Sequence, residues 1–236
     1  MKNIVLIHGA WHGGWVWQKV ATKLRRAGHS VFTPTLTGLG ERQHLIQAVD
    51  GPDVHVDDVV NLASFRELDN VVLVGHSYGG MIAASAATIL ESCSTHLVLL
   101  DALVPEKAGQ SHWEIASDDA RFTKELLETS ESIPPTGFHR WAASKQHQQW
   151  LADMTTPHPA STFVKGVSRL KHPSTLKLER SYILCTRHTP SPFEAIYERL
   201  KKDPRWDCFK LDCLHDAMVD KPTELAGLIC RIVDSE

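Results

Sequence analysis

The stretch that most constrains the fold is NVVLVGHSYGGM, at residues 70–81. It starts as a buried-strand pattern and continues into a helix of small residues, with Gly75 and Gly79 on either side of Ser77. A strand that turns directly into a helix through G-x-S-x-G strains its central residue, and glycines two positions away leave the space this turn needs. The pattern predicts a Ser77 hydroxyl that projects above a sheet at a helix N-terminus. The alternative is an ordinary glycine-rich turn.

Apolar runs with the length of buried parallel strands recur along the chain, and segments with helical periodicity lie between several of them. The expected strands are residues 3–7, 30–33, 71–74, 96–100, 181–185 and 207–211. Strands that alternate with helices form βαβ units. We therefore predict an α/β fold with a mostly parallel, doubly wound sheet of about six strands.

The alternation stops in the middle of the chain, between residues 103 and 178. No buried strand is evident there, and tryptophan and phenylalanine residues are scattered among polar and proline-rich pieces. We expect this segment to be an inserted, mostly helical cap over the sheet. The core is then residues 1–102 and 179–236, and core and cap together form a single structural domain.

Composition argues against several functions. The 236 residues carry a formal net charge of -3, so the chain lacks the basic surface that nucleic acid requires. The N-terminal apolar run is too short for a signal peptide or a membrane span, which indicates a cytoplasmic protein without a membrane partner. Five cysteines without a CxxC pair indicate neither a disulfide framework nor a zinc ribbon.

A serine nucleophile needs a base and backbone donors for the oxyanion. His215 is the candidate base, because it follows the last strand and reactive groups collect outside the carboxyl ends of strands. The backbone N–H groups of Tyr78 and Ala10 are the candidate oxyanion hole, although the loop at residues 8–15 can also simply close a strand-to-helix turn. His76 is expected to point to the other side of the serine turn.

Five segments resemble a known family: HGAWHGGWVW, PTLTGLGERQHL, VVLVGHSYGGM, LDALVPEKAGQS and HDAMVDKPTELA. They resemble the α/β-hydrolase fold, specifically small bacterial carboxylesterases of the pyrethroid hydrolase kind, and more distantly plant methylesterases and hydroxynitrile lyases. The resemblance implies ester hydrolysis by a Ser-His-acid triad with Ser77 and His215, an oxyanion hole at Ala10 and Tyr78, and neither a metal nor an organic cofactor. The resemblance to the lyases would imply a site with Thr at position 10 and Lys directly after the catalytic histidine. This chain has Ala10 and Asp216 at these positions.

The expected position of the triad acid departs from the family pattern. In most members it follows the strand before the histidine strand, where this chain has CTRHTP, with His188 about where Asp would stand. Asp101 is the expected substitute, because moving the acid to the next strand shifts it by only about 4.8 Å. Asp101 can alternatively cap the turn that enters the cap segment. Asp212 and Asp216 also remain open as the acid.

These observations predict a serine hydrolase that cleaves carboxylic esters of small apolar substrates through an acyl-enzyme intermediate, with Ser77, His215 and Asp101 as catalytic residues. The aromatic residues of the cap, with Trp11 and Trp15, indicate an apolar pocket. The alternative is a small-ligand-binding module derived from a hydrolase, and a hydroxynitrile lyase is less favoured. The expected partner is a small apolar ester, and a homodimer is left open.

Overall fold

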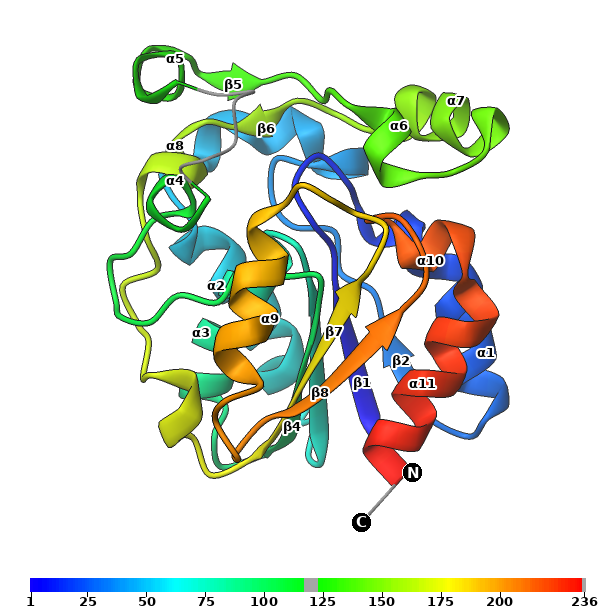
Figure 1. Ribbon diagram of the computed structural model, residues 1–236. Helices are drawn as coiled ribbons and strands as arrows, with labels where there is room; N and C mark the ends of the chain where they lie inside the picture. Colours follow the sequence, from blue (N-terminus) through cyan, green and yellow to red (C-terminus); the bar gives the residue numbers. More distant parts are fainter. Residues whose placement is uncertain (117–122, 235–236) are drawn as a thin grey trace.

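Six parallel strands form one sheet in the computed structural model, which describes residues 1–116 and 123–234 (Figure 1). Their order across the sheet is β2-β1-β3-β4-β7-β8. The strands are β1 (Asn3–Ile7), β2 (Ser30–Phe32), β3 (Val71–His76), β4 (Ser94–Leu100), β7 (Glu179–Cys185) and β8 (Asp207–Leu211). The predicted α/β fold with a parallel sheet of about six strands is confirmed.

Helices cover both faces of this sheet (Figure 1). On one face α1 (Gln18–Arg26) packs against α11 (Pro222–Asp234), and on the other face lie α2 (Asp53–Phe65), α3 (Gly79–Ile89) and α9 (Pro192–Leu200). Because both faces are covered, every residue of β3 is buried. Three short elements also lie in residues 1–102 and 179–236: η1 (Gly14–Trp17), η2 (Gly40–Ala48) and α10 (Ala217–Asp220).

The direction of winding reverses at β1. This strand pairs with β2 on one side and with β3 on the other, so the loops that leave β1 and β3 start next to each other. Open α/β sheets bind ligands at such a reversal, outside the carboxyl ends of the strands. The loop at residues 8–15 and the turn around Ser77 therefore lie where a site is expected.

The segment between β4 and β7 passes over this edge of the sheet (Figure 1). It contains α4 (His112–Ile115), α5 (Lys124–Thr129), α6 (Phe138–Trp141), α7 (Lys145–Met154), α8 (Ser161–Val164), η3 (Pro173–Thr175), β5 (Ser132–Ile133) and β6 (His158–Pro159). The antiparallel pair of β5 and β6 was not expected, because strands of two residues carry no readable periodicity. Residues 117–122 of the predicted cap lie outside the described residues, and the division into core and cap stays a prediction.

All five cysteines are free thiols. Within residues 1–116 and 123–234, every helix is too short or too polar to cross a membrane. The expected cytoplasmic location stays a prediction.

The close contact between the start of α3 and β1 leads to a stability prediction. A Cβ on Gly79 would lie 2.5 Å from the His8 carbonyl oxygen and 2.8 Å from that of Ile7. We expect Gly79→Ala to lower the free energy of unfolding by about 1–3 kcal/mol, measured by urea denaturation. The control is Gly227→Ala in α11, where the nearest atom is the Arg231 side chain at 3.8 Å, and it should raise stability by up to about 1 kcal/mol. Similar losses in both variants would contradict the close packing at Gly79.

Candidate active site

Ser77 takes the strained conformation that the sequence predicts. Its φ is +54°, a region that costs a non-glycine residue about 1–3 kcal/mol. Neighbouring backbone holds it there: the Ser77 N–H donates to Leu100 O at 3.2 Å, and the Leu103 N–H donates to Ser77 O at 3.0 Å. A Cβ on Gly75 would lie only 2.5 Å from Gly79 O, so the turn requires glycine. The helix that follows places its N-terminus at Ser77.

The loop after β1 passes next to the serine. A Cβ on Gly9 would lie 3.0 Å from the Ser77 Cβ, and Ala10 lines the same cavity as Ser77. Trp11 takes a φ of +66°, and its N–H donates to His158 Nδ1 at 3.2 Å. These contacts fix the course of the loop and place Gly9 next to Ser77, one residue before the predicted oxyanion donor Ala10.

Tyr78 is the N-cap residue of α3. Its side chain is fully buried, with the hydroxyl 2.8 Å from His55 Nδ1, and burial raises the pKa of the phenol. The ring therefore anchors the serine turn in the interior. Of the polar groups of Tyr78, the backbone N–H is the one that can donate to an oxyanion in the site.

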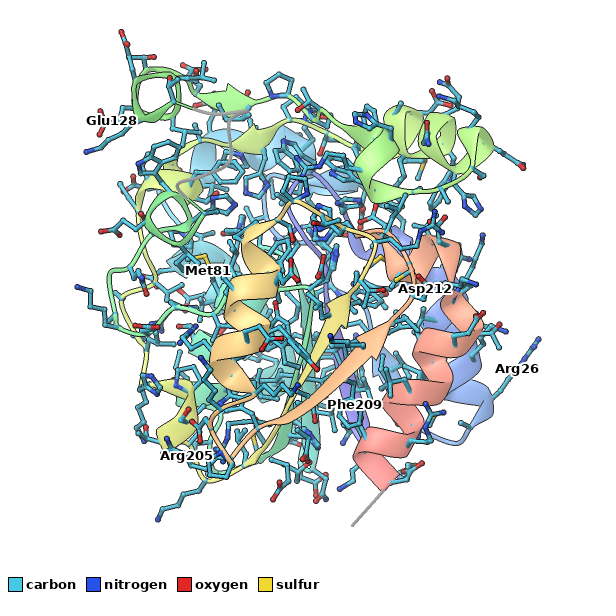
Figure 2. The ribbon with its side chains drawn as sticks, in the orientation of Figure 1. Arg26, Met81, Glu128, Arg205, Phe209 and Asp212 are labelled. Atoms are coloured by element: carbon cyan, nitrogen blue, oxygen red, sulfur yellow. The ribbon has the colours of Figure 1, made fainter. Side chains whose placement is uncertain are left out.

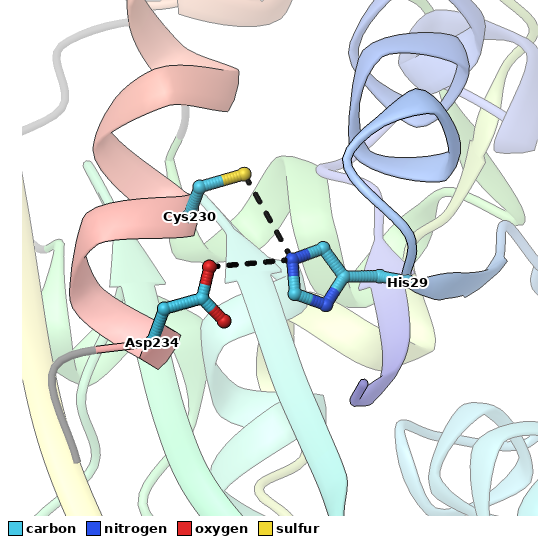
Figure 3. Close-up of side chains that lie close together, drawn as sticks. All are labelled: His29, Cys230 and Asp234. Atoms are coloured by element: carbon cyan, nitrogen blue, oxygen red, sulfur yellow. Dashed lines mark hydrogen bonds and ion pairs between the residues drawn. The ribbon is translucent and has the colours of Figure 1, made fainter.

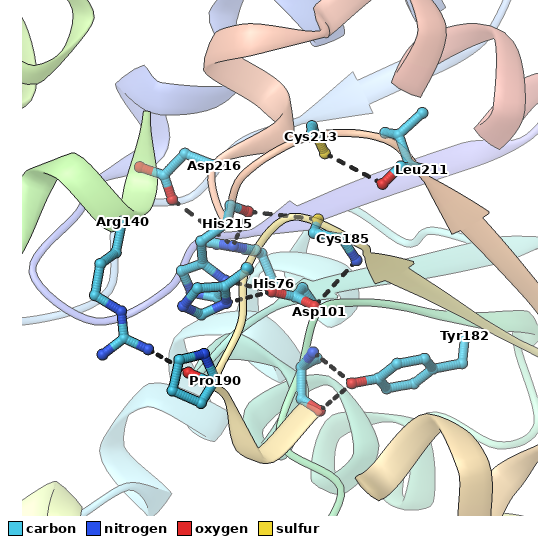
Figure 4. Close-up of polar contacts among 12 residues, drawn as sticks. His76, Asp101, Arg140, Tyr182, Cys185, Pro190, Leu211, Cys213, His215 and Asp216 are labelled. Atoms are coloured by element: carbon cyan, nitrogen blue, oxygen red, sulfur yellow. Dashed lines mark hydrogen bonds and ion pairs between the residues drawn. The ribbon is translucent and has the colours of Figure 1, made fainter. Parts of the chain in front are cut away.

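Asp101 and His215 meet in the structure (Figure 4). Asp101 Oδ2 lies 2.6 Å from His215 Nδ1, and Oδ1 accepts a hydrogen bond from the Cys185 N–H at 3.1 Å. Asp101 is fully buried and has a φ of +42°. Its own N–H donates to Ile183 O at 2.7 Å, which ties the end of β4 to β7. The carboxylate thus faces the neighbouring strand and the histidine, and it does not cap the turn that follows.

A second imidazole contacts the same carboxylate. His188 Nδ1 lies 2.8 Å from Asp101 Oδ2, the oxygen that also contacts His215. The ring centroids of His188 and His215 are 4.3 Å apart. Burial raises the pKa of Asp101, and the hydrogen bond from His188 opposes that rise. His188, which stands about where most family members carry the acid, therefore contacts Asp101, the predicted substitute, and nothing in the local sequence indicates this contact.

The expectation for His76 is wrong. Its Nε2 lies 3.1 Å from the carbonyl oxygen of His215, and the two ring centroids are 4.4 Å apart. Burial lowers the pKa of His76 well below its usual value, and repulsion by His215 adds to the shift. A neutral His76 that donates from Nε2 holds the backbone of the turn carrying His215. The chain segment with His215 folds back over the end of β3, and local spacing cannot show this.

The other candidate acids, Asp212 and Asp216, differ in exposure and in their contacts. Asp212 is exposed where β8 ends, whereas Asp216 is buried with Oδ2 3.1 Å from His12 Nε2 (Figures 2 and 4). His12 Nδ1 in turn lies 2.6 Å from Ala10 O. Burial disfavours a charged His12, but attraction and hydrogen bonding to Asp216 outweigh this effect and raise its pKa. Asp216 therefore supports the loop of Ala10, a role that the sequence analysis missed.

Ser77, His215 and His188 open on a cavity of about 360 Å³. Its wall also includes aromatic and basic side chains, among them Trp11, His12, His112, Arg140, Trp141 and Phe193. Trp15 was expected at the pocket, but it packs edge to face on Trp150 with ring centroids 5.0 Å apart. The cavity has the mixture of apolar walls and a few polar groups that is typical of small-molecule sites.

His29, Cys230 and Asp234 form a separate group of potential metal ligands near the C-terminal end of α11 (Figure 3). His29 Nε2 lies 3.9 Å from the Cys230 sulfur and 3.7 Å from Asp234 Oδ2. Zinc accepts these donor types. However, the Lys2 N–H donates to His29 Nδ1 at 3.4 Å, which places the proton of a neutral ring on Nε2. We therefore interpret the group as a hydrogen bond between His29 and Cys230 with the Asp234 carboxylate nearby, and not as a metal site.

The buried His12–Asp216 pair leads to a pH prediction. Because Asp216 raises the pKa of His12, the pair adds stability that is fully present below about pH 6.5 and is lost as pH rises through the folded-state pKa of His12. Urea unfolding at several pH values should therefore show that Asp216→Asn costs more stability at low than at high pH. Asp212→Asn is the matched exposed control and should show no such trend. A pH-independent cost of Asp216→Asn would contradict the charged pair.

Comparisons with known proteins agree with this fold. The sequence pattern of the Alpha/beta hydrolase family matches residues 4–228. A carbendazim hydrolyzing esterase of Nocardioides sp. (strain SG-4G) is 36% identical over 249 aligned positions, covering 98% of this chain and 100% of that protein. Methylesterase 9 of Arabidopsis thaliana is 26% identical and is aligned over 99% of both chains.

A solved structure gives the same result at the level of the fold. An extracellular alpha/beta-hydrolase from a Paenibacillus species superimposes with a TM-score of 0.85, at 23% identity, over 98% of this chain and 99% of that one. These comparisons confirm the predicted resemblance to esterases of this fold. The chain belongs to the alpha/beta hydrolase family.

Proposed function

We propose that this protein, a carboxylic ester hydrolase, cleaves esters of small apolar substrates through an acyl-enzyme intermediate formed on Ser77. The observation that carries the proposal is the 2.6 Å contact between His215 Nδ1 and Asp101 Oδ2, on the wall of the cavity that Ser77 also lines. The names of the esterase and methylesterase relatives support ester chemistry. This set of side chains matches the serine, base and acid of serine hydrolases on other folds.

The proposed reaction follows from these positions. The Ser77 oxygen attacks the ester carbonyl while its proton passes to Nε2 of His215. Asp101 accepts the Nδ1–H of His215, which selects the tautomer with Nε2 free for this proton and stabilises the charged ring. The backbone N–H groups of Ala10 and Tyr78 stabilise the tetrahedral oxyanion.

The second half returns the enzyme to its starting state. The protonated His215 gives its proton to the departing alkoxide, which leaves as an alcohol. A water molecule then attacks the acyl group on Ser77 while His215 takes a proton from the water. When the bond between the acyl carbon and the Ser77 oxygen breaks, His215 returns this proton to the Ser77 oxygen and the carboxylic acid is released. No cofactor is needed in this scheme.

The walls of the cavity support an apolar ester as the substrate. Trp11, Trp141 and Phe193 supply apolar surface, and the volume of about 360 Å³ suits a molecule with one or two small rings. The hydroxynitrile lyase alternative gains no support: position 10 is Ala, and the residue after His215 is Asp216, whose carboxylate is engaged by His12.

The rival function is a hydrolase-derived module that only binds a ligand. Two features favour the enzyme. Ser77 is held at a φ of +54°, a strained conformation that ligand binding alone does not require. The carboxylate of Asp101 is buried in a position where its most direct use is to orient His215.

Covalent labelling tests the proposal. A fluorophosphonate probe forms an adduct only with an activated serine, so we expect one equivalent of label on the peptide that contains Ser77, identified by mass spectrometry. Ser77→Ala should abolish both the label and the hydrolysis of p-nitrophenyl acetate. Ser85→Ala is the control, because the buried Ser85 hydroxyl is hydrogen bonded to Arg169 O, and it should keep both. A folded protein without label on Ser77 would favour the binding module.

A further inference from the structure

His188 is a buried titratable group that the proposed reaction does not use. It lies in the loop after β7, where the His188 N–H donates to Cys185 O at 3.2 Å and the Arg187 N–H donates to Cys213 O at 3.0 Å. Phe193 packs against it with ring centroids 5.5 Å apart. The same phenyl ring stacks on His215 at 5.1 Å. The loop and the phenyl ring thus hold both imidazoles beside one carboxylate.

The hydrogen bonds at Asp101 determine the protonation of these rings. An ionised carboxylate only accepts, so the Nδ1 atoms of both His188 and His215 must donate to Oδ2. The other oxygen, Oδ1, accepts from the Cys185 N–H. His188 is therefore one of three donors that compensate a carboxylate with no exposed surface.

We propose that His188 is a positioning residue for the hydrolysis: it keeps Asp101 ionised and turns its carboxylate so that one oxygen meets His215. The inference rests on the proposed function, since it assigns a partner to the proposed acid. His188 acts here through the hydrogen bond that its Nδ1–H donates to Asp101 Oδ2. It is not itself a nucleophile or a base.

The other ionisable groups around Asp101 do not replace this donor. His76, at the end of β3, attracts the carboxylate when charged but directs its Nε2 to the backbone of His215. Arg140 of α6 lines the cavity and donates to the Pro190 carbonyl oxygen. Tyr182 of β7 is buried, with its hydroxyl bonded to the Ala102 backbone.

The direction of the pH effect of removing His188 follows from the influences on the pKa of Asp101. Burial raises its pKa and the hydrogen bond from His188 is the largest opposing influence. Removing His188 should raise the pKa further, so the carboxylate would become protonated at a higher pH as the solution is acidified. The acidic limb of the profile of kcat/KM against pH should therefore move to higher pH.

Two substitutions separate this role from simple packing. In His188→Asn, the side-chain NH₂ group lies near the position of the imidazole Nδ1 and can still donate to Asp101. In His188→Leu, the volume is similar but the donor is lost. With p-nitrophenyl acetate, we expect the acidic limb of His188→Leu to shift upward by about one pH unit, with kcat/KM at least about tenfold lower near neutral pH. His188→Asn should keep the limb close to that of the native protein.

A uniform loss of kcat/KM at every pH in His188→Leu, with the limb unmoved, would overturn the proposal and leave His188 as a packing residue. An unchanged profile would overturn it as well. The titration of the Asp101 carboxylate, followed by carbon NMR and assigned with Asp101→Asn, gives a second readout that needs no turnover. Its midpoint should be higher in His188→Leu than in the native protein, and equal midpoints would contradict the proposal. An inactive native protein with unlabelled Ser77 would instead contradict the proposed function.

Discussion

The arrangement of the site depends on one buried carboxylate. Asp101 has no exposed surface, and an ionised group in such a place is costly unless hydrogen bonds compensate it. Its donors come from three separate places: the end of β7, the loop after β7 and the loop after β8. Compensating this single charge therefore draws His188 and His215 together, although they belong to different loops.

Three residues with a strained backbone conformation lie at the same edge of the sheet. Trp11, Ser77 and Asp101 follow the adjacent strands β1, β3 and β4, and each has a positive φ that disfavours a non-glycine residue. The strain is maintained because the strands beneath are buried and the turns are hydrogen bonded to one another, as in the bond from Leu103 N–H to Ser77 O. A rigid sheet thus fixes groups that would otherwise relax, which is a requirement for a preorganised oxyanion site.

Much of this arrangement could be predicted from local sequence. The strands are short apolar runs, and the glycine spacing around Ser77 is one that few other turns require. Asp101 could be proposed because it directly follows a strand, and the carboxyl ends of the strands lie together in a parallel sheet. The pairs His12–Asp216, His76–His215 and Asp101–His188 could not be predicted. Their members are 204, 139 and 87 positions apart, and no local period encodes contacts over such separations.

The central claim is that the acid of the triad has moved to Asp101. The most direct test is kcat/KM for p-nitrophenyl acetate with the native protein, with Asp101→Asn and with the exposed control Asp212→Asn. The amide keeps the shape of the side chain but removes its charge, so the account predicts a loss on the order of 10⁴ for Asp101→Asn and almost none for Asp212→Asn. A folded Asp101→Asn protein with native activity would contradict the claim.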